Sequence, residues 1–333
     1  MVLQQYLRHL PHIGLHREQR LRLEGCTSWD GILNAARPLA GLDRAAWDDI
    51  CVACEQSLRA VESDDAAYFA ARIPPPDQWR VLAHWFEHLS YFDIETSGLE
   101  IGSTVTLISC FHRGAAHSFL AEENMDDFLD LMEEVKVLVS FNGASFDVPR
   151  VLDRFHIHRL PCAHVDLRWL CHHAGWRGGL KTIEHALGLC RPPDLVGLGG
   201  AEAVRLWQMW SELGDVQAKR TLVRYCVADT VMLSLLASRL IAQHGVEVTV
   251  PSETELWRHV SEAYPSLGVA APGGVPPPLP QSVSTRSRHH TSPVVAADRF
   301  SIAEMMGDVK GLSRSEKQAR LRERWRQQQR TWN

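Results

Sequence analysis

Short β-type runs alternate with amphipathic helical segments between about residue 88 and residue 245, and this alternation constrains the fold more than any other feature of the chain. The runs LSYFDIET, TVTLISCFH, AHSFL and VLVSFN are rich in β-branched and aromatic residues, and DDFLDLMEEV has a helical pattern. Further helices are expected around 146–156, 166–174, 180–188, 201–212 and 216–243. Strands mixed with helices in this way predict an α/β domain over residues 86–250.

Residues 1–85 have helical patterns and no β-type run, so we expect an all-helical N-terminal region. From Trp47 to Val61, apolar side chains recur at steps of three and four, which indicates one buried helical face. The same spacing explains Cys51 and Cys54 without a metal ion.

The start of the chain resembles a helix-hairpin-helix, with a helix to Leu10, a turn over residues 11–16 and a basic helix after it. In that family, the backbone amides of a glycine-rich turn hold a DNA phosphate. Only Gly14 of the usual glycines is present here. A purely structural pair of helices is therefore the alternative interpretation.

The C-terminal part of the chain has a different composition. Residues 265–310 are rich in Pro, Gly and Ser without apolar periodicity, which predicts a disordered linker, and residues 311–333 form a basic tail without helix breakers. Eight Lys/Arg against three acidic residues give the segment 308–333 a charge of +5, so the net charge of −5 leaves −10 for the rest. A body this acidic does not resemble a general nucleic-acid coat, although a metal-dependent nuclease needs a negatively charged metal pocket.

Several protein classes are excluded by composition. No stretch of about 18 consecutive apolar residues is present, and the first residues have charges where a signal peptide needs an apolar core. These features argue against a membrane or secreted protein. The eight cysteines are spread through apolar segments, unlike a disulfide scaffold, so we expect reduced thiols and a cytoplasmic location.

Three acidic elements carry the candidate chemistry. Asp93 and Glu95 are one residue apart in a β-type run, so both carboxylates lie on one face, where Mg²⁺ or Mn²⁺ is the natural partner. An exposed edge strand with solvated acids is the alternative. Asp147 follows a Gly-containing turn and begins a helix, where it could serve only as a cap, and Asp229 lies one helical turn after Tyr225.

Together these elements resemble the DEDD superfamily of 3'-5' exonucleases, which have a ribonuclease H-like fold. The matching motifs are Asp93-x-Glu95, Asn142-x-x-x-Phe146-Asp147 and Tyr225-x-x-x-Asp229, with 54 residues from Asp93 to Asp147 and 82 from Asp147 to Asp229. The position that carries histidine in the other branch is Arg224, so the third motif is of the tyrosine type. The second and third motifs are similar to those of the proofreading domains of family-B DNA polymerases. The order of the regions resembles the bacterial YprB-like, or ribonuclease H-like domain, proteins.

This resemblance implies a ribonuclease H-like mixed sheet flanked by helices, and hydrolysis of phosphodiester bonds from the 3' end of single-stranded DNA or RNA. The four carboxylates would hold two Mg²⁺ or Mn²⁺ ions, and Tyr225 would orient the attacking water. Residues expected to contact the substrate are Thr96, Leu99, Asn142 and Phe146. The sequence does not discriminate DNA from RNA, nor does it give the oligomeric state or the pathway. A nucleic-acid-binding or scaffolding protein that keeps the fold without turnover is the alternative from another class.

Two further features have open interpretations. Arg177 and Lys181 lie beside a Gly-rich turn and are candidates for phosphate contacts, with a solvated helix start as the alternative. Asp166 opens a helix, and its position favours a helix cap over a fifth metal ligand.

Overall fold

The computed structural model describes residues 2–98, 100 and 102–263. The expected linker and basic tail, and Leu99, lie outside the described residues. The N-terminal region contains five α-helices, as the sequence predicts: α1 (Leu15–Leu23), α2 (Trp29–Leu33), α3 (Arg44–Glu62), α4 (Ala66–Arg72) and α5 (Trp79–His84), with 3-10 turns η1 (Pro75–Asp77) and η2 (Phe86–His88).

Side-chain caps define where several of these helices begin. The carboxylate of Asp43 accepts a hydrogen bond from the Ala46 amide at the start of α3, and that of Asp65 accepts one from the Tyr68 amide at the start of α4. The predicted apolar face of α3 is turned inward, with Trp47, Ile50 and Cys54 buried. Cys51 and Cys54 are free thiols within this packing, as expected.

The prediction of a helix that ends at Leu10 is wrong. Residues 2–12 form successive turns, in which the amides of Tyr6, Leu10 and Ile13 bond to carbonyls three residues earlier. These turns bury Leu3, Tyr6, Leu7 and Leu10, whose spacing would also suit one face of a helix, so the apolar spacing alone does not distinguish successive turns from a helix. The arginines Arg17 and Arg22 donate to the backbone carbonyls of His12 and Gln5. The helix-hairpin-helix interpretation therefore lacks its first helix.

A five-stranded mixed sheet forms the centre of the α/β part, and its strand order is β3-β2-β1-β4-β5. Its strands are β1 (Leu89–Thr96), β2 (Val105–His112), β3 (Ala115–Leu120), β4 (Val137–Ser140) and β5 (Ala163–Asp166). β1 pairs antiparallel with β2 and parallel with β4, and its register with β2 shifts between Glu95 and Thr96. The sequence patterns predicted four of these strands. β5 was missed because its sequence, AHVD, has a single β-branched residue, and the strand forms through its parallel pairing with β4.

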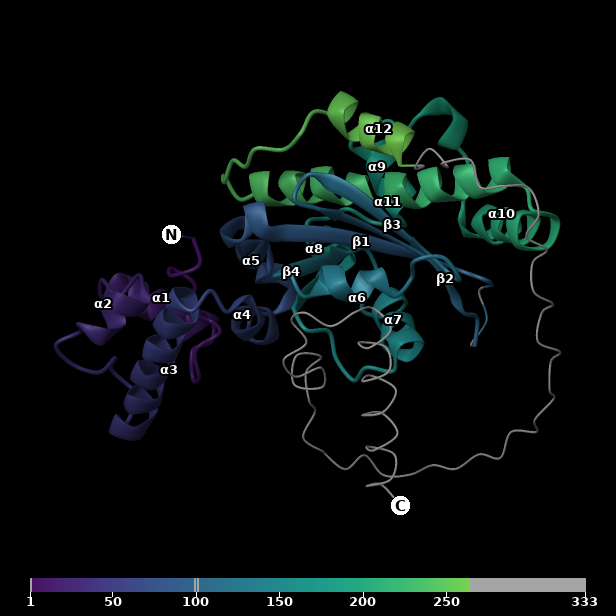
Figure 1. Ribbon diagram of the computed structural model, residues 1–333. Helices are drawn as coiled ribbons and strands as arrows, with labels where there is room; N and C mark the ends of the chain where they lie inside the picture. The colour runs from purple at the N-terminus through teal and green to yellow at the C-terminus, as the bar shows by residue number, and fades with distance from the viewer. Residues whose placement is uncertain (1, 99, 101, 264–333) are drawn as a thin grey trace, which may run out of the picture.

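The two faces of the sheet pack against different helices (Figure 1). Phe92, Ile94 and Leu138 point to α6 (Asp127–Met132) and α7 (Asp147–Phe155). Tyr91, Val137 and Val139 belong to the core on the other side, where the helices are α8 (Leu167–His173), α9 (Leu180–Ala186), α10 (Gly200–Leu213), α11 (Val216–Ala242) and α12 (Glu253–Glu262), with the 3-10 turn η3 (Pro193–Leu195). The predicted α/β class, a mixed sheet flanked by helices, is confirmed.

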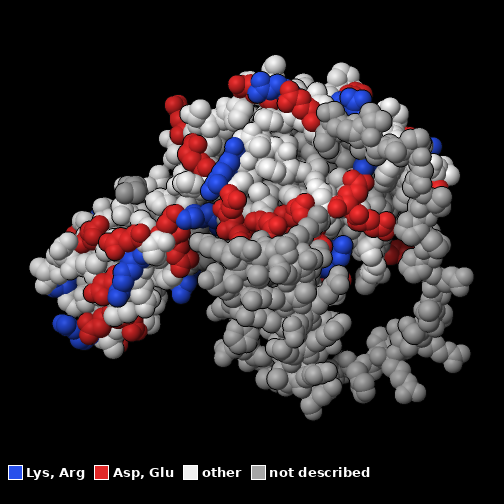
Figure 2. Space-filling model, in the orientation of Figure 1, with Lys and Arg blue, Asp and Glu red and all other residues white. Residues whose placement is uncertain are grey.

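Helix α11 is the central helix of the larger core. By length and composition it could cross a membrane, but 89% of its most apolar window is buried inside the protein. It packs on β1 and β2 and also contacts α5, while α4 packs against β5. The hydrophobic core is therefore continuous between the N-terminal helices and the sheet. On the face shown in Figure 2, acidic and basic side chains are interspersed over the N-terminal helices.

Candidate functional site

The first acidic motif lies on β1, on the face covered by α11. Asp93 and Glu95 alternate with Phe92 and Ile94, whose side chains are buried on the opposite face. Glu95 is 7% exposed and Asp93 is partly exposed. The solvated edge strand considered as an alternative does not apply, because β1 has neighbours on both sides.

The third motif lies opposite β1 on α11. Tyr225, Cys226 and Asp229 are all buried, and the Cys226 thiol donates to the backbone oxygen and to Oδ2 of Asp93, both at 3.7 Å. Ligand atoms of Asp93, Glu95 and Cys226 lie within 4.8 Å of one another. Cys226 was not singled out in the sequence, since a cysteine in an apolar helix carries no signal of its own.

The second motif reaches the site through the loop between β4 and α7. Asn142 has a φ of 68°, and the buried Gly143 follows it. Asp147 begins α7 but does not cap it, because its Oδ1 accepts a hydrogen bond from the Ile94 amide of β1 at 3.2 Å. The capping alternative is therefore wrong, and this bond places the carboxyl of Asp147 next to the strand that carries Asp93 and Glu95.

The acidic groups raise one another's pKa. Burial raises the pKa of Asp93 well above its usual value, and the negative charges of Asp147, Asp229 and Glu95 add to the effect. Burial and the charge of Asp229 also raise the pKa of Glu95. Burial raises the pKa of Asp147 to about 7, in spite of the hydrogen bond from Ile94. Such a cluster ionises fully only beside a cation.

The residues around Asp93 and Glu95 fit one hard divalent cation. Two carboxylates of one strand face supply the oxygen ligands that Mg²⁺ and Mn²⁺ prefer. Burial raises the pKa of the Cys226 thiol well above its usual value, so the thiol stays protonated and is a poor ligand for such an ion.

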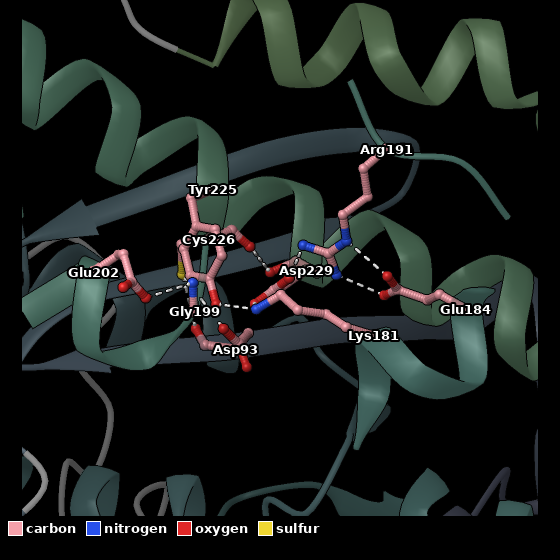
Figure 3. A network of polar contacts seen from close by, with 10 residues as sticks. Asp93, Lys181, Glu184, Arg191, Gly199, Glu202, Tyr225, Cys226 and Asp229 are labelled. Atoms are coloured by element: carbon pink, nitrogen blue, oxygen red, sulfur yellow. Dashed lines mark hydrogen bonds and ion pairs between the residues drawn. The ribbon is translucent and has the colours of Figure 1, made fainter. Parts of the chain in front are cut away.

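Two basic side chains enter the site from the segment between α8 and α10 (Figure 3). Lys181 donates a hydrogen bond to the hydroxyl of Tyr225, and its Nζ lies 3.9 Å from Asp229 Oδ2. Arg191 forms an ion pair with Asp229 and hydrogen bonds to both carboxylate oxygens of Glu184. Arg191 and Glu184 were missed, because nothing in their sequence spacing relates them to Asp229. Lys181 was singled out as a phosphate contact, and a solvated helix start does not describe its position.

Asp166 holds the loop of the second motif. Its Oδ1 accepts from the amides of Asn142 at 2.7 Å and Arg168 at 3.0 Å, and its Oδ2 accepts from Ala144 at 3.0 Å. It is the N-cap of α8, so the expected helix cap is confirmed. Its carboxylate accepts hydrogen bonds from backbone amides, and it is not in the acidic group of Asp93 and Glu95.

The other expected substrate contacts lie in different elements. Arg168 and Ser145 donate to the side-chain oxygen of Asn142, and the guanidinium of Arg150 lies 3.7 Å from the ring centre of Phe146. Thr96 is buried and donates to the carbonyl of Gly98 at 2.6 Å. Arg177 is exposed, and its Nη1 lies 2.7 Å from His172 Nε2.

A cavity of about 430 Å³ opens between α4 and the segment that precedes β5. Its lining includes Ala67, Arg159 and His164 but none of the acidic residues described above. We therefore place the candidate site at the acidic cluster.

Comparisons with known proteins agree with this architecture. Residues 90–241 match the model of the RNase_H superfamily. The α/β part has a ribonuclease H-like fold. An uncharacterized protein of Methanocaldococcus jannaschii is 29% identical over 154 residues, which cover 41% of this chain and 86% of that protein.

One solved structure is also similar to part of the chain, that of the family B DNA polymerase from the hyperthermophilic archaeon Pyrobaculum calidifontis. The identity is 18% and the TM-score is 0.35 over 47% of this chain and 24% of the polymerase chain. The chain thus spans about a quarter of the length of that polymerase.

Proposed function

We propose that this protein is a metal-dependent nuclease, specifically a 3'-5' exonuclease of the tyrosine type that acts on single-stranded DNA or RNA. The observation that carries the proposal is the convergence of three motifs from distant parts of the sequence. Asp147 accepts a hydrogen bond from the amide of Ile94, which lies between Asp93 and Glu95 on β1. The thiol of Cys226 on α11, one residue after Tyr225, donates a hydrogen bond to Asp93.

In this proposal, each residue of the site has a distinct part. Asp93 and Glu95 hold a divalent ion, which when bound polarises the scissile phosphodiester and activates water. Asp147 extends the negative field of the site, fixed by its bond to Ile94. Tyr225 orients the attacking water, and Lys181 fixes the tyrosine hydroxyl by donating a hydrogen bond to it.

The surroundings of the cluster support nucleic acid as the substrate. Asn142 and Phe146 lie in the loop that precedes Asp147 and offer amide and aromatic groups for sugar and base. Arg177, exposed between α8 and α9, offers a guanidinium for phosphate. All eight cysteines are free, which supports a reducing compartment such as the cytoplasm as part of the proposal.

The test uses single-stranded DNA and RNA labelled at either the 3' or the 5' end, incubated with the full-length protein in Mg²⁺ or Mn²⁺. We expect ladders that shorten from the 3' end, and no product with EDTA. Asp93→Asn should abolish hydrolysis without loss of folding, since it removes a ligand charge and not core volume.

Glu87→Gln is the matched control, because Glu87 is an exposed acid two residues before β1. Hydrolysis by Asp93→Asn at the rate of the unaltered protein would refute the assignment. Binding of the oligonucleotides without any cleavage would favour the scaffolding alternative.

A further inference from the structure

Arg191 is a buried arginine that bridges two acids inside the candidate site. Its side chain is 7% exposed, and those of its partners Glu184 and Asp229 are 3% and 10% exposed. Nε and Nη2 of Arg191 donate to the two oxygens of Glu184, each at 2.6 Å, and Nη1 is in contact with Asp229 Oδ1 (Figure 3). The guanidinium therefore lies between α9 and α11.

This arginine is held firmly in place. The bidentate pairing with Glu184 fixes the plane of the guanidinium. The backbone is anchored on both sides, since Leu189 and Leu195 are buried and two prolines follow Arg191 directly. Although burial opposes its charge, the carboxylates of Asp229 and Glu184 raise the pKa of Arg191, so it is a permanent cation.

The position of Arg191 changes what Asp229 offers to a metal ion. Oδ1 of Asp229 is already in contact with the guanidinium, and Oδ2 has the ammonium of Lys181 at 3.9 Å. A divalent ion bound to Asp229 would lie beside two positive charges in a buried environment, where such repulsion is poorly screened. Asp93 and Glu95 form no ion pair among the described residues, although the charge of Lys181 lowers the pKa of each and so partly offsets the effect of burial. The residues around Asp229 thus do not fit the second of the two ions that the family resemblance implies.

We propose that Arg191 is a built-in cation that takes the place of a second metal ion at Asp229, so that the site binds one divalent ion, at Asp93 and Glu95. This inference rests on the proposed function. In it, Arg191 is a positioning residue that holds Asp229 and supplies positive charge near the reacting phosphate. Unlike a bound metal ion, this charge cannot dissociate into solvent.

The test is the stoichiometry of Mn²⁺ binding to the full-length protein without nucleic acid. Titration calorimetry and the paramagnetic resonance signal of free Mn²⁺ measure it independently of hydrolysis. We expect one ion per chain in the unaltered protein and at least a tenfold loss of affinity in Asp93→Asn.

The double variant Arg191→Met with Glu184→Gln removes the cation and its partner together, so that no unpaired Glu184 remains. It should bind two Mn²⁺ ions, because Oδ1 of Asp229 then loses its ion pair and can act as a ligand, while Lys181 remains beside Oδ2. Arg224→Met is the matched control, since Arg224 lies on α11 and its ion pair with Asp194 is outside the site. That variant should keep one ion.

The outcomes separate the inference from the proposed function. Two ions of similar affinity in the unaltered protein would overturn the inference and leave the nuclease proposal intact. One ion in both the unaltered protein and the folded double variant would show that Arg191 does not exclude the second. Absence of Mn²⁺ binding altogether would overturn both proposals. If the double variant does not fold, the stoichiometry of the unaltered protein still decides.

Discussion

Replacement of Gly143 by alanine is expected to displace the loop that places Asp147 against β1. A Cβ atom at residue 143 would lie 2.1 Å from Ser140 Oγ and 2.6 Å from Ser140 Cβ. Ordinary van der Waals contacts begin at 3.4 Å. The Ser140 hydroxyl can rotate away, but Ser140 Cβ cannot, so the backbone of the loop and β4 must separate by about 0.8 Å (3.4 − 2.6). Gly143 does not have a positive φ, so the backbone conformation itself tolerates alanine.

The expected effect has two parts. Overpacking of a buried position lowers the free energy of unfolding by about 1–3 kcal/mol, which for a domain of this size lowers Tm by roughly 2–12 °C. The carbonyl of Gly143 accepts a hydrogen bond from the Val148 amide at 2.9 Å, so movement of the loop carries the start of α7 and Asp147 with it. A misplacement of about 1 Å in a catalytic group lowers kcat/KM by about 100-fold.

Thermal unfolding and the hydrolysis of end-labelled oligonucleotides measure the two parts separately. Gly14→Ala is the matched control, because a Cβ atom there meets nothing within 4 Å. Adding Ser140→Gly to Gly143→Ala removes both clashing atoms, so the double variant should regain part of the lost Tm. If Gly143→Ala unfolds and hydrolyses as Gly14→Ala does, the close approach of the loop to β4 does not position Asp147.

Three further predictions follow from the site and the tail. Tyr225→Phe should keep Mn²⁺ binding but slow hydrolysis about 10- to 1000-fold in single-turnover assays, because it deletes the hydroxyl that Lys181 contacts. Unchanged hydrolysis rates would remove Tyr225 from the mechanism. The pKa of Asp147 is raised to about 7, so the metal-free folded protein keeps a proton that the unfolded chain loses above about pH 4. The free energy of unfolding should therefore fall between pH 5 and pH 8 relative to that of Asp147→Asn. Equal pH profiles of Tm for the two proteins would contradict this. Deletion of residues 270–333 removes the segment 308–333 with its charge of +5. The truncated protein should have a higher KM than the full-length protein at low salt, the same kcat, and the same KM at high salt. If the two proteins have the same KM across the whole salt series, the tail is better explained as a partner-binding segment.

The sequence determined those features that depend on residues close together in the chain. Alternation along β1 put Asp93 and Glu95 on one face, and helical spacing put Tyr225 and Asp229 on one face of α11, because strand and helix geometry fix side-chain directions within a segment. Family resemblance added the order of the three motifs. Local patterns failed in β5, where AHVD has a single β-branched residue, and in residues 2–12, where apolar spacing typical of a helix is met by successive turns.

Only the tertiary structure decided the contacts between segments that are far apart in the chain. The bond from Ile94 to Asp147 joins residues 53 positions apart, and the contact of Cys226 with Asp93 joins residues 133 positions apart. The same is true of Arg191, which has no local partner pattern and is recognised only when α9 and α11 bring Glu184 and Asp229 to it. Local geometry fixes which face of a segment a side chain occupies, but the charges it meets depend on how strands and helices pack, and in a buried site those charges determine which cations the acids can bind.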